Sequence, residues 1–311
     1  MAGRQFIRTS LGLILFVAAT HAAQAQDYYQ QSVDSPAAPL HQTLPAGYTA
    51  NPGVAEERRD WQPSTALYHF DNEIWFAGGA SNLNYKESVK PIPDSDTGDL
   101  ASLAGGFSFL TRYNTYFAAD GSAAFGGGHY NGASYDNATG LYDIPAQAST
   151  NELVLNVDGK IGQGLPVGRN VMFIPYAELG FRYWKRDLNN DQSEDYRNFD
   201  GMGGVMFQWV PADRVLLSMY GSAGSTFGSS VLANGTTLDL GSAAIEKVGA
   251  KVGYDLTHEW EIFSTVDYEH FHYVQSGSEL MLIGNNLYSA YEPSSRTEDT
   301  TFRVGFGYHF R

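Results

Sequence analysis

Apolar and polar residues alternate along this chain with a period of two, and this alternation limits the possible folds more than any other feature. In residues 170–186, Phe173 and Leu179 fall on one set of alternate positions, whereas Glu178 and Arg182 fall on the other. Successive side chains of a β-strand point to opposite faces of its sheet. The pattern therefore predicts a strand with one apolar face and one charged face. A helix would need a period of about 3.6 residues instead.

The alternation recurs in ten segments of a length that suits a tilted strand crossing the hydrocarbon layer of a membrane. The predicted strands cover residues 73–85, 99–112, 115–128, 150–162, 170–186, 196–210, 213–225, 241–255, 258–274 and 298–310. The predicted fold class is all-β: a transmembrane antiparallel up-and-down β-barrel of about ten strands, with eight or twelve as the alternatives. A closed barrel is favoured because it leaves no backbone amide unpaired within lipid.

The connections between the predicted strands alternate between short and generally longer ones. The short ones are Tyr113-Asn114, residues 163–169, Pro211-Ala212 and Leu256-Thr257. The longer ones, rich in Asp, Asn, Ser and Gly, are residues 86–98, 129–149, 187–195, 226–240 and 275–297. Barrels of the outer membrane place tight turns on the periplasmic side and longer loops outside the cell. An even number of strands then returns the C-terminus to the periplasmic side, where the N-terminal segment also remains.

Aromatic residues near the predicted strand ends are candidates for the two belts that lie at headgroup depth. They are Trp75, Trp209, Tyr254, Trp260 and Tyr308 beside the short turns, and Tyr85, Tyr183 and Tyr268 beside the long loops. Pro175 interrupts the fifth predicted strand. Because proline lacks the amide donor of a ladder, it predicts a bulge or a later strand start there.

The N-terminal part of the chain divides into two segments before the predicted barrel of residues 71–311. Residues 1–25 have the three regions of a secretory signal peptide: basic Arg4 and Arg8, an apolar stretch, and small residues that predict cleavage after Ala25. Residues 26–70 are polar and interrupted by prolines, which predicts a mostly irregular periplasmic segment. The aromatic residues at its end could fold into the barrel mouth.

Composition excludes several kinds of site. The chain has no cysteine, so neither disulfides nor thiolate metal sites are available to it. Its net charge of −15 argues against a nucleic-acid partner, because such proteins concentrate Lys and Arg against phosphate. The glycines do not form a phosphate-binding motif followed by a helix, and no cofactor is predicted.

The C-terminal segment, residues 302–310, carries a resemblance to a known class. Its alternating pattern, ending in Phe306, Tyr308 and Phe310, resembles the last strand of small Gram-negative outer-membrane barrels of the porin-like, opacity-protein and OmpA-type class. The strand number is closer to that of the omptin proteases. The resemblance implies an integral protein of the outer membrane in contact with lipid and lipopolysaccharide. It also implies that the three aromatics form a signal for the barrel-assembly machinery.

Strict alternation places a set of charged residues on the lumen face. The predicted network comprises Asp158, Lys160, Glu178, Arg182, Arg186, Lys247, Lys251, Glu261, Asp267, Glu269 and Arg303. In a narrow barrel, where side chains fill the interior, such residues form ion pairs that hold the wall together. The alternative is that Arg182, Arg186, Asp267 and Glu269 form the selectivity ring of a small pore.

The segment from Asp267 to His272 is a candidate for hydrolytic chemistry, because omptins use acidic pairs with a histidine at the extracellular rim. Acid–base work needs carboxylate and imidazole within hydrogen-bond reach. Alternation sends Asp267 and Glu269 inward and His270 and His272 outward, which argues against a dyad within this strand.

The acidic segment 187–195 is a weak candidate for calcium, with oxygen ligands at alternate positions: Asp187, Asn189, Asp191 and Asp195. Gln192 stands where such a tight turn prefers glycine, so a solvated acidic loop is the favoured interpretation. No other metal site is predicted.

The function favoured by these patterns is non-enzymatic: an integral outer-membrane barrel with an envelope structural or surface-interaction role through its extracellular loops. A narrow porin-like channel for small solutes is the first alternative, and an omptin-like surface protease is the second. The sequence names no extracellular ligand.

Overall fold

The computed structural model describes residues 65–88, 92–136, 141–189, 192–233, 235–283 and 286–310. The predicted signal peptide and most of the predicted irregular segment lie outside these ranges. The elements are α3 (Thr65–Asp71), β1 (Glu73–Glu87), β2 (Ser95–Leu110), β3 (Thr115–Asp136), β4 (Leu141–Gln163), β5 (Leu165–Pro166), β6 (Val171–Asn189), β7 (Gln192–Ala212), β8 (Val215–Ala233), β9 (Thr236–Gly241), β10 (Ala244–Asp255), β11 (Trp260–Tyr273), β12 (Glu279–Ile283), β13 (Asn286–Ala290) and β14 (Ser295–His309).

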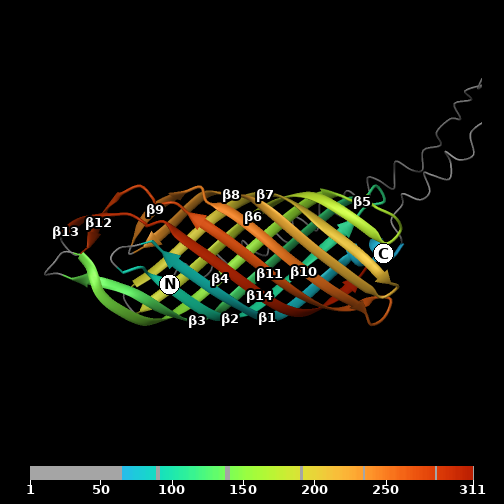
Figure 1. The fold of residues 1–311 in the computed structure, drawn as a ribbon, viewed down its shortest axis with the longest axis horizontal. Coiled ribbons are helices and arrows are strands. Elements are labelled where there is room, and N and C mark those ends of the chain that lie inside the picture. The colour runs from blue at the N-terminus through green and yellow to red at the C-terminus, as the bar shows by residue number, and fades with distance from the viewer. Residues whose placement is uncertain are drawn as a thin grey trace, which may run out of the picture. The chain divides into compact units, whose positions relative to one another are not determined.

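Ten of these strands close into one antiparallel barrel, as predicted. They follow the order β10, β11, β14, β1, β2, β3, β4, β6, β7 and β8, and β8 pairs back with β10. The last strand lies beside the first, with Glu73 opposite His309. Figure 1 shows the strands steeply inclined to the long axis, with β5 near one end and the β12–β13 hairpin at the other.

The two ends of the barrel differ in their connections. At one end, called the turn end, the described chain reverses within a few residues, for example at Thr111–Asn114 and at Asp213-Arg214. Asn114 adopts a φ of 62° in the first of these turns, a conformation that asparagine tolerates better than most residues. At the other end, called the loop end, β9 pairs with β8, and β12 and β13 form a separate two-stranded sheet.

Several predicted outer loops are wrong in detail, because the strands continue through them. Residues 129–149 were expected to form a loop, but β3 and β4 remain paired as far as Asp136 and Leu141. Residues 226–240 hold the end of β8 and most of β9, and residues 275–297 hold the β12–β13 hairpin. Ladder hydrogen bonds do not require lipid, so strands extend where the apolar alternation has ended.

The outer face of the barrel carries a belt of exposed apolar side chains. It includes Ile74, Phe76, Leu103, Phe125, Ile161, Phe173, Leu179, Val205, Trp209, Met219, Val248, Val252, Tyr254, Trp260, Val266, Phe302, Val304, Phe306 and Tyr308. Toward the loop end the same outward rows turn polar, as at Asn82, Lys86 and Arg296. The belt therefore lies in the part of the wall nearer the turn end, and the strands rise beyond it.

Leu179→Arg tests the position of this belt. Leu179 is 68% exposed on the outer face, so an arginine there would meet hydrocarbon and destabilise the barrel by about 2–4 kcal/mol if it lies near mid-bilayer. Thr300→Arg, on the polar side of Phe302 in β14, serves as the control and is expected to cost at most about 1 kcal/mol. Urea unfolding in lipid vesicles measures both, and equal costs would place the belt elsewhere.

Two aromatic residues assigned to the lipid belts face the interior instead. Trp75 lies between outward Ile74 and Phe76, and its ring packs against Phe263 at 5.9 Å between centroids. Tyr85 is only 1% exposed. Proximity to a strand end was the basis for the assignment, whereas the parity of the strand decides the face.

Pro175 does not form a bulge. It lies in β6 opposite Val205 of β7. On the other edge of β6, the pairing with β4 ends at Tyr176, and the pairing with β5 begins at Phe173. The break between β4 and β5 thus coincides with the residue that lacks an amide donor.

A short helix closes the turn end. Residues 65–70 are predicted to be mostly irregular, but Thr65–Asp71 forms α3. Its Leu67 and Phe70 are 0% and 1% exposed and pack with wall residues in the turn-end cluster, which is Leu67, Phe70, Leu110, Tyr116, Met172, Ile174, Val210 and Leu216. Trp61, one of the aromatic residues near the end of the predicted irregular segment, lies outside the described residues. In the part of the chain that is described, no helix is long and apolar enough to cross a membrane.

Candidate functional site

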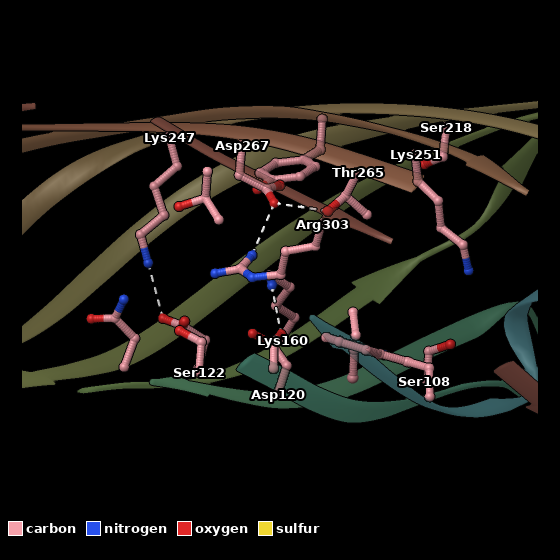
Figure 2. A pocket seen from close by; sticks show the side chains of 18 of the residues that line it. Ser108, Asp120, Ser122, Lys160, Ser218, Lys247, Lys251, Thr265, Asp267 and Arg303 are labelled. Atoms are coloured by element: carbon pink, nitrogen blue, oxygen red, sulfur yellow. Dashed lines mark hydrogen bonds and ion pairs between the residues drawn. The ribbon is translucent and has the colours of Figure 1, made fainter. Parts of the chain in front are cut away.

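A cavity of about 240 Å³ lies inside the barrel. Its wall carries charged and hydroxyl side chains from several strands, and Figure 2 shows Asp120, Lys160, Lys247, Asp267 and Arg303 pointing into it. Tyr116 of the turn-end cluster lines it, as do Ala124 and Val154, which belong to a second apolar group. The cavity therefore lies between two apolar groups.

The second group, the loop-end cluster, fills the interior above the cavity. It consists of Leu83, Tyr85, Leu100, Ala124, Val154, Trp184, Tyr196, Met202, Val231, Leu238, Leu240, Ala243, Ile245, Phe271 and Tyr273. Trp184 stacks on Tyr196 at 4.8 Å between centroids. The aromatic rings of this cluster are thus buried inside the wall.

Lys247 contacts three carboxylates of the lumen network. Its Nζ lies 2.9 Å from Asp158, 3.0 Å from Glu178 and 3.4 Å from Glu269. Asp158, Glu178 and Asp200 bring one carboxylate oxygen each within 4.8 Å of one another. Lys247 lies beside this acidic group and supplies the positive charge that offsets it, as a bound cation would.

The other cations of the predicted network are paired as well. Arg182 donates to Glu269 at 2.8 Å, Arg303 to Asp267 at 3.1 Å, and Lys160 to Asp120 at 3.0 Å. Lys251 lies 2.7 Å from Glu73 and 3.0 Å from Glu261. Arg186 pairs with Glu194 and Glu87 nearer the loop end. All eleven predicted network residues thus lie inside the barrel and take part in ion pairs.

The interior is more acidic than the sequence suggested. The predicted network contains five acids and six bases, but further buried acids join them: Glu73, Glu87, Asp96, Glu194 and Asp299. Glu87, Asp96 and Glu194 fall in predicted loops, and Glu73 and Asp299 lie near the ends of predicted strands. The inward direction of the three loop residues follows only when the strands are extended beyond the apolar belt.

Asp71, the last residue of α3, lies at the turn end of the interior. Gln208 donates a hydrogen bond of 2.6 Å to its Oδ1. Burial raises the pKa of Asp71 to about 7, against a smaller opposing effect of that hydrogen bond.

The segment from Asp267 to His272 does not form a catalytic dyad along β11. Asp267 accepts from Arg303 and from Tyr220, and Glu269 pairs with Arg182, all inside the barrel. His272 is exposed on the outer face. Strand parity therefore separates the acids from the imidazoles, as expected.

The candidate calcium segment spans the end of β6 and the start of β7. Asp187 is paired with Lys185 at 2.8 Å, and Asp195 accepts from Tyr183 at 3.0 Å. Asn189 pairs with Gln192 in the ladder, and Asp191 lies outside the described residues. In the described residues these carboxylates do not converge.

The proposed assembly residues lie at the end of β14. Phe306 and Tyr308 are exposed on the outer face, 54% and 40% respectively, and Phe310 follows the strand. The backbone amide of Phe310 donates to Asn72 at 3.0 Å.

Glu292 ties the loop-end hairpin to the interior. Its Oε1 accepts hydrogen bonds from Tyr196 at 2.7 Å and Tyr85 at 3.1 Å. Its backbone amide donates a hydrogen bond of 2.8 Å to Oγ of Ser276, on the other side of the hairpin, and its carbonyl accepts one of 2.9 Å from the Ser276 amide. One carboxyl group therefore fixes the base of the β12–β13 hairpin on the loop-end cluster.

This attachment is expected to loosen as the pH rises. Burial, with a contribution from the Glu194 carboxylate, raises the pKa of Glu292 above its ordinary value of 4.5. The folded protein holds this proton more tightly than the unfolded chain does, so the stabilisation is complete below that value and is lost as pH rises through the raised pKa. A spin label at Gly277→Cys should become more mobile as the pH rises through the raised pKa of Glu292. Glu292→Gln should abolish the change; the same change in that variant would rule Glu292 out.

Comparison with solved structures identifies the architecture. The outer membrane protease OmpT from Escherichia coli superposes with a TM-score of 0.52 at 12% identity, covering 77% of this chain and 97% of that chain. The chain has the fold of the outer-membrane β-barrels. Neisserial surface protein A (TM-score 0.31, 10% identity, 76% and 97% covered) and OprG from Pseudomonas aeruginosa (0.33, 11%, 81% and 100%) also match. No protein-family model and no curated protein matches the chain.

The likeness to OmpT bears out the resemblance to the outer-membrane barrel class that the C-terminal strand implied. At this level of identity it establishes architecture and leaves activity to the side chains. The barrel strands and the apolar belt together describe an integral protein of the outer membrane.

Proposed function

We propose that this barrel is a non-enzymatic, closed component of the outer membrane that serves envelope structure or surface contact through its loop end. The observation that carries the proposal is the filling of the interior. Apolar clusters lie on both sides of the cavity, and the six lumen cations of the described chain are all held in ion pairs. Paired and packed charges stabilise a wall but do not offer mobile ions a continuous path.

The proposed orientation places the turn end, with α3 and the C-terminus, in the periplasm. The belt then contacts lipid and lipopolysaccharide, and the polar strand extensions stand outside the cell, where a surface partner would meet them. Phe306, Tyr308 and Phe310 serve the barrel-assembly machinery during insertion.

Single-channel recording in planar bilayers tests the closed state against the narrow-pore alternative. The refolded protein should produce no stable, reproducible conductance at moderate voltage. Pairing Phe70→Ala with Trp184→Ala removes one large ring from each apolar cluster, and this variant should admit small ions. A uniform open level in the unmodified protein would establish the pore and overturn the proposal.

Protease activity is not proposed, because Asp267 and Glu269 are engaged by Arg303, Arg182 and Lys247. Intact protein in lipopolysaccharide-containing detergent should leave a basic peptide uncleaved. Cleavage that disappears in Asp267→Asn would establish the protease instead.

A further inference from the structure

Two histidines and one aspartate converge at the turn end, outside the lumen network. His69 comes from α3, Asp255 ends β10, and His309 ends β14. The Nε2 atom of His69 lies 3.3 Å from Oδ2 of Asp255, and Nε2 of His309 lies 3.2 Å from Oδ1 of the same carboxylate. One ligand atom from each of the three residues fits within a span of 4.8 Å.

The ligand atoms are spaced closely enough to share one metal ion. Nitrogen and carboxylate ligands bind zinc at about 2.0–2.2 Å, which places two ligands of one tetrahedral ion about 3.3 Å apart. The nitrogens of His69 and His309 lie 3.3 and 3.2 Å from the two different oxygens of Asp255, and one ligand atom from each residue fits within a span of 4.8 Å. Two imidazoles and one carboxylate are a donor set that suits Zn²⁺ and its neighbours in the first transition row.

Two buried ring nitrogens of this group make no hydrogen bond in the described residues. Nε2 of His69 is shielded from solvent, makes no regular hydrogen bond in the described residues and lies 3.3 Å from Oδ2 of Asp255. His309 is 4% exposed, and its unbonded Nδ1 is also buried. A metal ion would give the neutral His69 nitrogen a strong partner and would at the same time pair with the Asp255 carboxylate beside it.

The surroundings hold the ligands in place and leave a route to them. The amide of His309 donates to the carbonyl of Glu259 at 2.9 Å, and that of Asp255 to Arg214 at 3.0 Å. The ring of His258 stacks on His69 at 4.9 Å and 7° between planes. Glu261 lies 3.9 Å from Nε2 of His309 and adds negative charge. The His69 side chain is 19% exposed, so the site is reached from the turn end.

We propose that His69, Asp255 and His309 bind one divalent transition-metal ion, Zn²⁺ or an ion of similar preference, with water in the fourth position. The ion joins α3 to the last residues of two wall strands. It thereby clamps the turn-end closure onto the barrel, and it does so independently of the conduction state proposed above.

Metal titration of the mature barrel tests the site. Protein stripped with a chelator should bind one Zn²⁺ per chain by calorimetry, and Co²⁺ should give the visible absorption of tetrahedral coordination. His309→Ala and His69→Ala should each weaken Zn²⁺ binding by at least about 100-fold. His272→Ala, which removes an exposed histidine of β11, is the matched control and should bind as the unmodified protein does.

Heat-modifiable migration on gels verifies that each variant is folded. His69→Ala is the decisive variant, because His69 belongs to the helix and not to the barrel wall. Absence of Zn²⁺ binding in the unmodified protein, or undiminished binding in folded His69→Ala, would overturn the proposal. Octahedral Co²⁺ absorption that is the same in all variants would indicate binding elsewhere and would overturn it equally.

Discussion

Lys247→Met is expected to destabilise the folded barrel by about 3–5 kcal/mol, because it leaves buried carboxylates without their counter-charge. The ammonium group of Lys247 contacts Asp158, Glu178 and Glu269 within 3.4 Å. Methionine fills a similar volume but offers no positive charge, so the carboxylates must take up protons or water. Urea unfolding followed by tryptophan fluorescence measures the loss.

Lys185→Met is the matched control for Lys247→Met. Lys185 pairs with Asp187 on the outer face, and both side chains are 36% exposed. Exposed pairs contribute only about 0–1 kcal/mol. Adding Glu178→Gln to Lys247→Met should recover part of the loss, since it removes one of the unpaired charges. If Lys247→Met costs no more than the control, the lumen network does not hold the wall together.

Phe70→Ala is expected to lower the free energy of unfolding by about 3–5 kcal/mol, because it opens a cavity in the turn-end cluster. The Phe70 ring is 1% exposed and packs with Leu110, Met172 and Leu216 among others. The loss arises at the interface of α3 with the wall, so it measures how firmly the helix closes this end.

Val167→Ala is the corresponding control at the turn end. Val167 lies between β5 and β6 and is 54% exposed, so its truncation should change stability by at most about 0.5 kcal/mol. Chemical denaturation of the folded protein in vesicles compares the two variants. A cost for Phe70→Ala that matches the control would mean that α3 does not pack in solution as described.

The strand order and the faces of the wall were predictable because the contrast between lipid and barrel interior imposes a pattern on the sequence. Where one face meets lipid and the other meets the interior, apolar and polar residues must alternate. This holds in residues 170–186, where Phe173 and Leu179 lie on the outer face and Glu178 and Arg182 face the interior, as predicted. Toward the loop end, outward residues such as Lys185 and Arg197 are polar like many inward ones, so the contrast fades and the strand ends were missed.

The partners within the lumen could not be predicted in the same way. Parity says that Lys247 faces inward, but its partners Asp158 and Glu178 lie on β4 and β6, and β10 has only β8 and β11 as neighbours. Contacts across the interior depend on barrel diameter and strand tilt, which no local pattern encodes. The same holds for Arg182 of β6 and Glu269 of β11.

The histidine–aspartate group at the turn end was missed for a related reason. His69, Asp255 and His309 are separated by long stretches of chain, and only barrel closure brings the last strand beside the first. An additional obstacle was α3, because residues 65–71 adjoin a proline-interrupted segment and form a helix that is stabilised by its burial rather than by its own length.

Thiol accessibility tests the closed lumen most directly, since the chain contains no cysteine of its own. Ser122 lines the central cavity, whereas Thr300 is exposed on the outer face. In the native barrel, Ser122→Cys should resist a charged maleimide and react only after unfolding, while Thr300→Cys reacts at once. Equal reaction rates for the two thiols in the native protein would show an interior open to solution and contradict the proposal of a closed lumen.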